Sequence, residues 1–215
     1  MTSSARPLRL AEAAARFGTF CWVERRLFEV TGAWASAPGV ADEARLFCFE
    51  ASAQHAWHAE LWAARLPVLA GWDHDALTRP AAPAGRLLER IAPGGWDGDE
   101  VTAAHRFVTV LARVALPALL ASYRGFSDRL VPVADGPAIR ALGLVVRDEE
   151  AELARAGELA DLLAERHAPA GPAGPPGEWT ASLGALLPRH EGELVLLPWW
   201  EEGQEPSAGP RAGGT

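Results

Sequence analysis

Apolar residues recur every three to four positions along most of this chain, which is the period of a helix buried on one side. Four long segments carry this period, at residues 8–35, 42–65, 99–130 and 137–166. Proline, glycine or a capping residue bounds each of them, and Pro137 suits the first turn of the last. Strand signals are nearly absent, apart from the apolar run at 194–200. The pattern therefore predicts an all-α fold.

The links between these segments predict how the helices are arranged. Short links join the first helix to the second and the third to the fourth, whereas a Pro- and Gly-rich stretch at 69–95, with one short helix at 85–91, joins the two pairs. This order matches a four-helix bundle with a long crossover between helices 2 and 3. An ordinary helical bundle without a special site is the alternative.

The remainder of the chain divides at a change in composition. Residues 1–167 are expected to form the bundle. Residues 168–200 begin with a Pro/Gly linker, and we expect a short helix at 179–187 and packing of this C-terminal extension on the bundle. Residues 201–215 have the composition of a disordered tail.

Charge and cysteine content narrow the classes of partner. The 215 residues include 20 basic side chains, all arginine, and the formal net charge of -8 repels a phosphate backbone, so nucleic acid is not an expected partner. Cys21 and Cys48 have the spacing of neither a CxxC motif nor a disulfide framework and are interpreted as reduced core residues. Arginines near the N-terminus and the lack of a long apolar run favour a cytoplasmic protein that does not enter a membrane. A small-molecule substrate or a second copy of the chain stays open as a partner.

Ionisable residues occupy positions where a core stripe should be apolar. At about 100° per residue, Glu24 falls in the middle of the stripe of the first helix. His58 lies in the middle of the second helix's face with His55 on its flank, and Glu149 lies near the centre of the fourth helix's stripe with Glu152 at its edge. Their neighbours on these stripes include Phe17, Phe20, Phe28, Thr31, Phe47, Ala51, Gln54, Trp62, Leu142 and Val145. A buried carboxylate must shift its pKa, pair with a neighbour or bind a metal.

The positions of these residues along their helices predict that their side chains lie close together. Glu24 precedes the turn between the first two helices by about as many residues as His55 follows it, so an antiparallel pair brings both to one level. Alignment of the second pair would add Glu149 near the middle of the bundle. We therefore expect a single cluster of Glu24, His55, His58, Glu149 and Glu152.

This set resembles the metal site of the ferritin-like superfamily of carboxylate-bridged diiron and dimanganese proteins. That family has a Glu on helix 1, ExxH on helix 2, a Glu on helix 3 and ExxH on helix 4. Glu24 matches the first Glu, while His55-Ala-Trp-His58 and Glu149-Glu-Ala-Glu152 occupy the two motif positions, and the resemblance covers residues 8–166. His55 replaces a Glu, Glu152 replaces a His, and the third helix offers Tyr123 but no carboxylate at this level.

The resemblance implies a metal-dependent function. Imidazole and carboxylate groups suit Fe, Mn or Zn, and the five residues supply enough donors for one ion. Two His and one carboxylate with open positions form the arrangement that non-haem iron uses to activate oxygen. An oxygen-dependent oxidase or hydroxylase is therefore implied. The alternative is a metal-free bundle of the same fold that serves as a structural or partner-binding module.

Three weaker signals lie outside this cluster. Asp73-His74-Asp75 is a compact acidic and imidazole group that could bind a metal at the surface. Asp97-Gly98-Asp99-Glu100 is better interpreted as a turn and helix N-cap than as a calcium loop. His105 and Tyr123 fall on the core face of the third helix, where hydrogen-bonded core side chains are expected.

Overall fold

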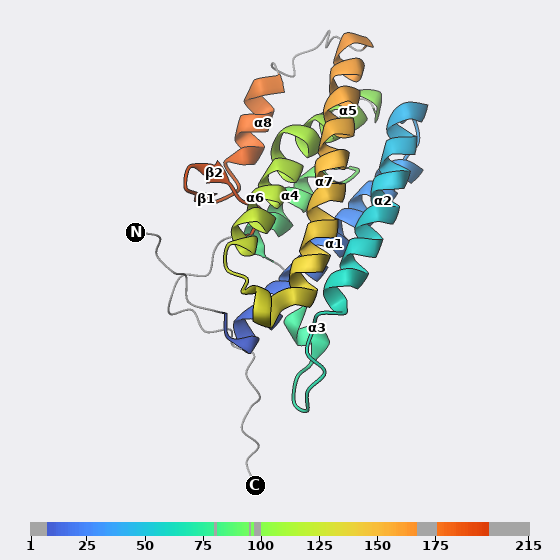
Figure 1. Ribbon diagram of the computed structural model, residues 1–215. Coiled ribbons are helices and arrows are strands. Elements are labelled where there is room, and N and C mark those ends of the chain that lie inside the picture. The colour runs from blue at the N-terminus through green and yellow to red at the C-terminus, as the bar shows by residue number, and fades with distance from the viewer. Residues whose placement is uncertain (1–7, 80, 95, 97–99, 167–175, 198–215) are drawn as a thin grey trace.

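The computed structural model describes residues 8–79, 81–94, 96, 100–166 and 176–197, and these are mostly helical, which confirms the all-α prediction (Figure 1). The long helices are α1 (Leu10–Ser36), α2 (Asp42–Ala63), α5 (Glu100–Val110), α6 (Leu116–Ser127) and α7 (Pro132–Arg166). The shorter elements are α3 (His74–Leu77), α4 (Ala82–Ile91), the π-helix η1 (Leu111–Ala115), α8 (Pro176–Gly184), β1 (Arg189–His190) and β2 (Glu193–Leu194). The predicted tail and the start of the predicted linker lie outside the described residues.

The long helices lie side by side, and the connection between α2 and α5 runs along their length. In Figure 1, α2 ends near α3 at one end of the molecule, whereas α5 lies at the other end, with α4 between them. The apolar side of α4 is buried, and Trp34 of α1 donates a hydrogen bond to the carbonyl oxygen of Ile91 at 2.9 Å. The short helix expected in this connection is present as α4, whereas α3 was not expected.

The third long helical segment passes through the core and contains a widened turn. Pro117 lacks an N–H group, and in the turn before it the N–H of Leu116 reaches the carbonyl oxygen of Leu111, five residues back. The stretch Thr102–Ser127 is long and apolar enough to cross a membrane by composition, but 83% of its most apolar window is buried inside the fold. Its hydrophobic character is therefore that of a central core helix.

The helix α7 begins with one short turn and then bends. Asp135 has non-helical angles, with φ of -109° and ψ of 16°, and its Oδ2 accepts a hydrogen bond from the N–H of Val131 at 2.8 Å. Pro137 then stands in the first turn of the main part of the helix, as predicted. The helix continues to Arg166, which is the predicted end.

The described part of the C-terminal extension packs on the long helices α5 and α6. The helix α8 ends at Gly184, three residues before the predicted end at Leu187. The two strands form a small antiparallel hairpin that lies mostly before the apolar run, not within it. Beyond the hairpin, the N–H of Leu196 donates to the carbonyl oxygen of Ala118 in α6 at 3.0 Å, which attaches the segment to the central helix.

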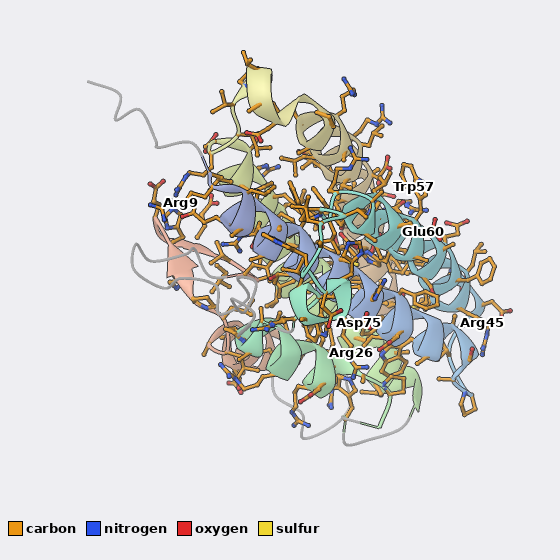
Figure 2. All side chains as sticks on the ribbon, turned by 90° about the horizontal axis from the view of Figure 1, so that it is seen from below. Arg9, Arg26, Arg45, Trp57, Glu60 and Asp75 are labelled. Atoms are coloured by element: carbon orange, nitrogen blue, oxygen red, sulfur yellow. The ribbon has the colours of Figure 1, made fainter. Side chains whose placement is uncertain are left out.

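The expected stripe of the first helix was wrong at one position. Phe28 is 44% exposed, whereas Glu24 and Thr31 are fully buried. The buried face of α1 is centred on the side of Leu27, so Phe28 falls at its outer edge. Apolar side chains also remain exposed on the outer side of α2, where Figure 2 shows Trp57 beside Glu60.

Candidate metal centre

The five predicted site residues meet in the interior. Glu24 comes from α1, His55 and His58 from α2, and Glu149 and Glu152 from α7, and all five are 0% exposed. One donor atom each from Glu24, His55, His58 and Glu149 lies within 4.8 Å of the other three. Among the described residues, this is the group that could hold a metal ion.

Helix geometry explains why these side chains converge. His55 and His58 are three residues apart, as are Glu149 and Glu152, so each pair lies on one face of its helix. A hydrogen bond at 3.0 Å from Ser52 Oγ to the carbonyl oxygen of Phe28 joins α2 to α1 one turn away from the site. The two motifs therefore project into the space beside Glu24.

Glu24 is held at both carboxylate oxygens. Its Oε2 lies 2.7 Å from His55 Nδ1, and its Oε1 accepts a hydrogen bond from the hydroxyl of Tyr123. The indole N–H of Trp62 donates to the Tyr123 oxygen at 3.2 Å, and the two rings stack with centroids 5.7 Å apart. Tyr123 thus makes the core hydrogen bond expected of it and occupies the third helix's position around the site.

Glu149 faces both imidazole rings. Its Oε1 lies 3.0 Å from His58 Nδ1 and 3.4 Å from His55 Nδ1, and Glu24 Oε1 lies 3.8 Å from His58 Nδ1. The second oxygen of Glu149 is buried without a hydrogen-bond partner. Buried polar atoms almost always have a hydrogen-bond partner. A buried oxygen without one, among several converging ligand atoms, is therefore a feature expected of a cation site.

The outer nitrogens of the two rings face another pair of carboxylates. His55 Nε2 lies 3.3 Å from Glu152 Oε1, and His58 Nε2 lies 3.5 Å from Asp148 Oδ2. These distances suit ion pairs, but neither contact is a hydrogen bond, and both nitrogens lack a hydrogen-bond partner. Gln54 Nε2 donates to Glu152 Oε2 at 2.9 Å. Glu152 therefore lies behind the His55 ring, and direct binding of a metal by Glu152 stays a prediction.

The charges of the cluster shift its pKa values strongly. Burial alone raises the pKa of Glu24, but the charge of His55, the hydrogen bond from His55 and the charge of His58 lower it to about 2. Burial lowers the pKa of His58, but its hydrogen bond to Glu149 and the charges of Glu24 and Glu149 raise it to about 10. The pKa of His55 is raised well above its ordinary value because the charges of Glu152, Glu149 and Glu24 outweigh burial. Burial and the charge of Glu24 raise the pKa of Glu149. The neighbouring carboxylates therefore favour the protonated form of both imidazoles.

These shifts predict how the stability of the metal-free protein depends on pH. The folded pKa of His58, about 10, lies above its ordinary value of 6.5, so its contribution is complete below pH 6.5 and is lost as the pH rises through about 10. The folded pKa of Glu24, about 2, lies below its ordinary value of 4.5, so its contribution is complete above pH 4.5 and is lost as the pH falls through about 2.

We expect the melting temperature in a chelator to be highest between these limits and to fall steadily on the alkaline side. Thermal unfolding at a series of pH values measures this profile, and His58→Gln should flatten the alkaline limb. An alkaline limb equally steep in that variant would contradict the assignment.

Of the weaker candidates, the Asp73-His74-Asp75 group does not join the cluster. Asp73 caps α3, because its side chain accepts a hydrogen bond from the N–H of Asp75 at 3.0 Å, and His74 Nε2 lies 3.1 Å from the carbonyl oxygen of Pro67. Residues 97–99 of the expected N-cap lie outside the described residues. The two cysteines are free and buried, as predicted.

Asp148 and Gln54 are the site residues that the sequence did not single out. Gln54 was expected on the core face of its helix, but only as one of several stripe residues. Asp148 lies four residues before Glu152 and therefore on the same face of α7, which is the one signal in the sequence that could have included it.

No family model, curated protein or solved structure matches this chain. What the site can do therefore follows from its own residues and geometry.

Proposed function

We propose that this chain is a ferritin-like four-helix bundle that binds one Fe, Mn or Zn ion between Glu24, His55, His58 and Glu149. The observation that carries this proposal is the convergence of four fully buried donors from three helices, each within 4.8 Å of the others. The ferritin-like assignment is supported by the origin of the donors, with one carboxylate from α1 and a motif each from α2 and α7. The long connection between α2 and α5 agrees with the crossover of that fold.

The charge of the cluster explains how a fully buried site can accept a divalent cation. The carboxylates favour protonation of both imidazoles, and two imidazolium groups would neutralise carboxylates that are otherwise buried and uncompensated. A divalent cation that displaces one proton from each Nδ1 leaves the total charge of the site unchanged. Metal binding is therefore an exchange of two protons for one ion, which avoids the cost of adding a net charge to the interior.

The donor set and its surroundings favour oxygen chemistry when the ion is iron. Two imidazoles with carboxylates and an open position form the ligand set with which iron activates oxygen, and we propose that the protein is an oxygen-dependent oxidase or hydroxylase of a small molecule. The rings of Phe20, Trp62 and Tyr123 pack together beside the site and exclude bulk water from it. Burial and the charge of Glu24 raise the pKa of Tyr123 well above its ordinary value, so its hydroxyl keeps its proton and continues to donate to Glu24.

Oxygen uptake by the iron-loaded protein tests this activity. The full chain is loaded with one equivalent of Fe(II) without oxygen and then mixed with air-saturated buffer in an oxygen electrode. We expect oxygen uptake and Fe(II) oxidation faster than with the same concentration of free Fe(II), and a return to the free-iron rate in His55→Leu. Tight iron binding without faster oxygen uptake would contradict the oxidase proposal while leaving the metal site in place.

One observation favours the metal-free alternative. In the structure Glu24, the most central carboxylate, already has a partner at each oxygen, because His55 contacts Oε2 and Tyr123 donates to Oε1. A bundle that used this network only to fix its packing would serve as a structural or partner-binding module. The four site atoms without hydrogen-bond partners, on His55, His58, Glu149 and Glu152, argue against a network complete in itself.

A further inference from the structure

Each imidazole of the candidate metal centre lies between two carboxylates. On the inner side, the Nδ1 atoms of His55 and His58 face Glu24 and Glu149. On the outer side, His55 Nε2 lies 3.3 Å from Glu152 Oε1 and His58 Nε2 lies 3.5 Å from Asp148 Oδ2. His55, the earlier histidine of α2, therefore pairs with Glu152, the later acid of α7, and His58 pairs with Asp148.

We propose that Glu152 and Asp148 are positioning residues that hold the Nε2–H groups of His55 and His58, so that both rings bind the ion through Nδ1. This inference rests on the proposed metal site and assigns Glu152 a role other than that of a ligand. In the ferritin-like pattern the position of Glu152 belongs to a histidine, whereas here the imidazoles are both on α2 and the outer acids are both on α7.

The chemistry of a neutral imidazole supports this assignment. A ring that binds a metal retains one proton, on the nitrogen that has a hydrogen-bond acceptor, and a carboxylate acceptor fixes the tautomer and makes the ligand more basic. The cation repels a proton from the inner nitrogen, and the outer carboxylates receive the remaining N–H. The two Nε2 atoms lack hydrogen-bond partners, and each lies 3.3 or 3.5 Å from an oxygen of its outer acid, so a small rotation of each ring would complete both hydrogen bonds.

Glu152 is expected to have a larger effect than Asp148. Glu152 is fully buried, and Gln54 donates to its second oxygen at 2.9 Å, which fixes the direction of the carboxylate. The side chain of Asp148 is 27% exposed, so water weakens its attraction for the His58 ring. Gln54 also donates to the backbone carbonyl oxygen of Asp148 at 3.2 Å, which connects the two acids.

Zinc affinity and the protonation of the histidines test the proposal together. Competition with a chromophoric chelator measures the zinc affinity of the full chain. Glu152→Gln keeps the shape of the side chain and removes its charge, and we expect it to weaken zinc binding by about 10- to 100-fold with one ion still bound. Asp148→Asn should weaken it less, and the exposed Glu158→Gln is the matched control on α7 that should leave the affinity unchanged.

The second readout is the ¹⁵N NMR spectrum of the zinc-loaded wild type with labelled histidine. We expect Nδ1 bound to zinc and Nε2 protonated in both rings, a result that does not depend on any variant folding. Zinc bound through Nε2, or an unchanged zinc affinity in Glu152→Gln, would overturn this inference but not the metal site. A wild type that binds no zinc, iron or manganese would overturn both.

Discussion

Replacing Glu149 by leucine is expected to abolish metal retention and to remove any dependence of the melting temperature on added metal. Glu149 Oε1 lies 3.0 Å from His58 Nδ1 and 3.4 Å from His55 Nδ1, so this one carboxylate oxygen is close to both histidines. A ligand that binds only the folded state stabilises it by mass action, by about 2.7 kcal/mol at a hundred times its Kd. The wild type should therefore melt at a higher temperature with metal than in a chelator, and Glu149→Leu should melt at the same temperature in both.

The neighbouring Glu150→Leu is the matched control for this variant. Glu150 is exposed on α7 and pairs with Arg124 at 2.9 Å, so its loss should leave metal retention intact and cost little stability. Glu24→Leu and His58→Leu should lose metal as Glu149→Leu does. Retention of one ion per chain by Glu149→Leu would remove this residue from the site.

The stability of Glu149→Leu distinguishes a metal-binding protein from a metal-free structural module. If the cluster never binds a metal, Glu149→Leu removes a desolvation penalty from the core, and such a replacement is often neutral or stabilising unless it leaves a partner unpaired. His58 is that partner, because its hydrogen bond to Glu149 Oε1 is lost. Glu149→Leu combined with His58→Leu removes both groups, and gain of stability by this double variant together with an absence of metal in the wild type would favour the structural module.

Gly18→Ala is expected to destabilise the fold strongly, although alanine is the better helix former. A Cβ atom at Gly18 would lie 2.2 Å from the carbonyl oxygen of Leu77 and 2.6 Å from its carbonyl carbon, so the backbone at the end of α3 would have to move away from α1. Alanine in place of glycine favours a helix by about 1 kcal/mol. Steric overlap in a packed interior costs about 1–3 kcal/mol, and here the obstacle is backbone, which cannot rotate away as a side chain can. We expect a net loss of stability in urea unfolding.

Gly143→Ala provides the control with the opposite sign. Gly143 lies within α7, and a Cβ atom there would meet nothing within 4 Å. The helix preference of alanine is then unopposed, and the free energy of unfolding should rise by up to about 1 kcal/mol. Equal stabilisation by both substitutions would show that α3 does not approach α1 as closely as the structure places it.

The sequence predicted the centre of the site because its residues contradict the apolar stripes on which they lie. Glu24, His58 and Glu149 stand where burial demands an apolar side chain, and this conflict is visible without coordinates. Asp148 was not placed on a stripe, and Gln54 lies on its stripe as an uncharged residue, so neither raises the conflict that a buried carboxylate does. Only the packing of α2 against α7 brings these two side chains to the site.

Other features depended on how the helices are rotated and packed. Helical periodicity defines a stripe but not which of its edges turns toward the neighbouring helix, and Phe28 was therefore placed in the core although it is exposed. The widened turn that precedes Pro117 in the third long helical segment was not predicted. Tyr123 was expected to form a core hydrogen bond, but the sequence could not show that Glu24 is its partner.

Metal content tests the central claim most directly. The full chain is purified without a chelator, offered Fe(II), Mn(II) and Zn(II) separately, freed of unbound ion and analysed for metal and for melting temperature. We predict one ion per chain for at least one of the three metals, with a higher melting temperature than in a chelator. Less than stoichiometric metal in all three samples, with melting temperatures equal to that of the chelated protein, would contradict the assignment of Glu24, His55, His58 and Glu149 as a metal site.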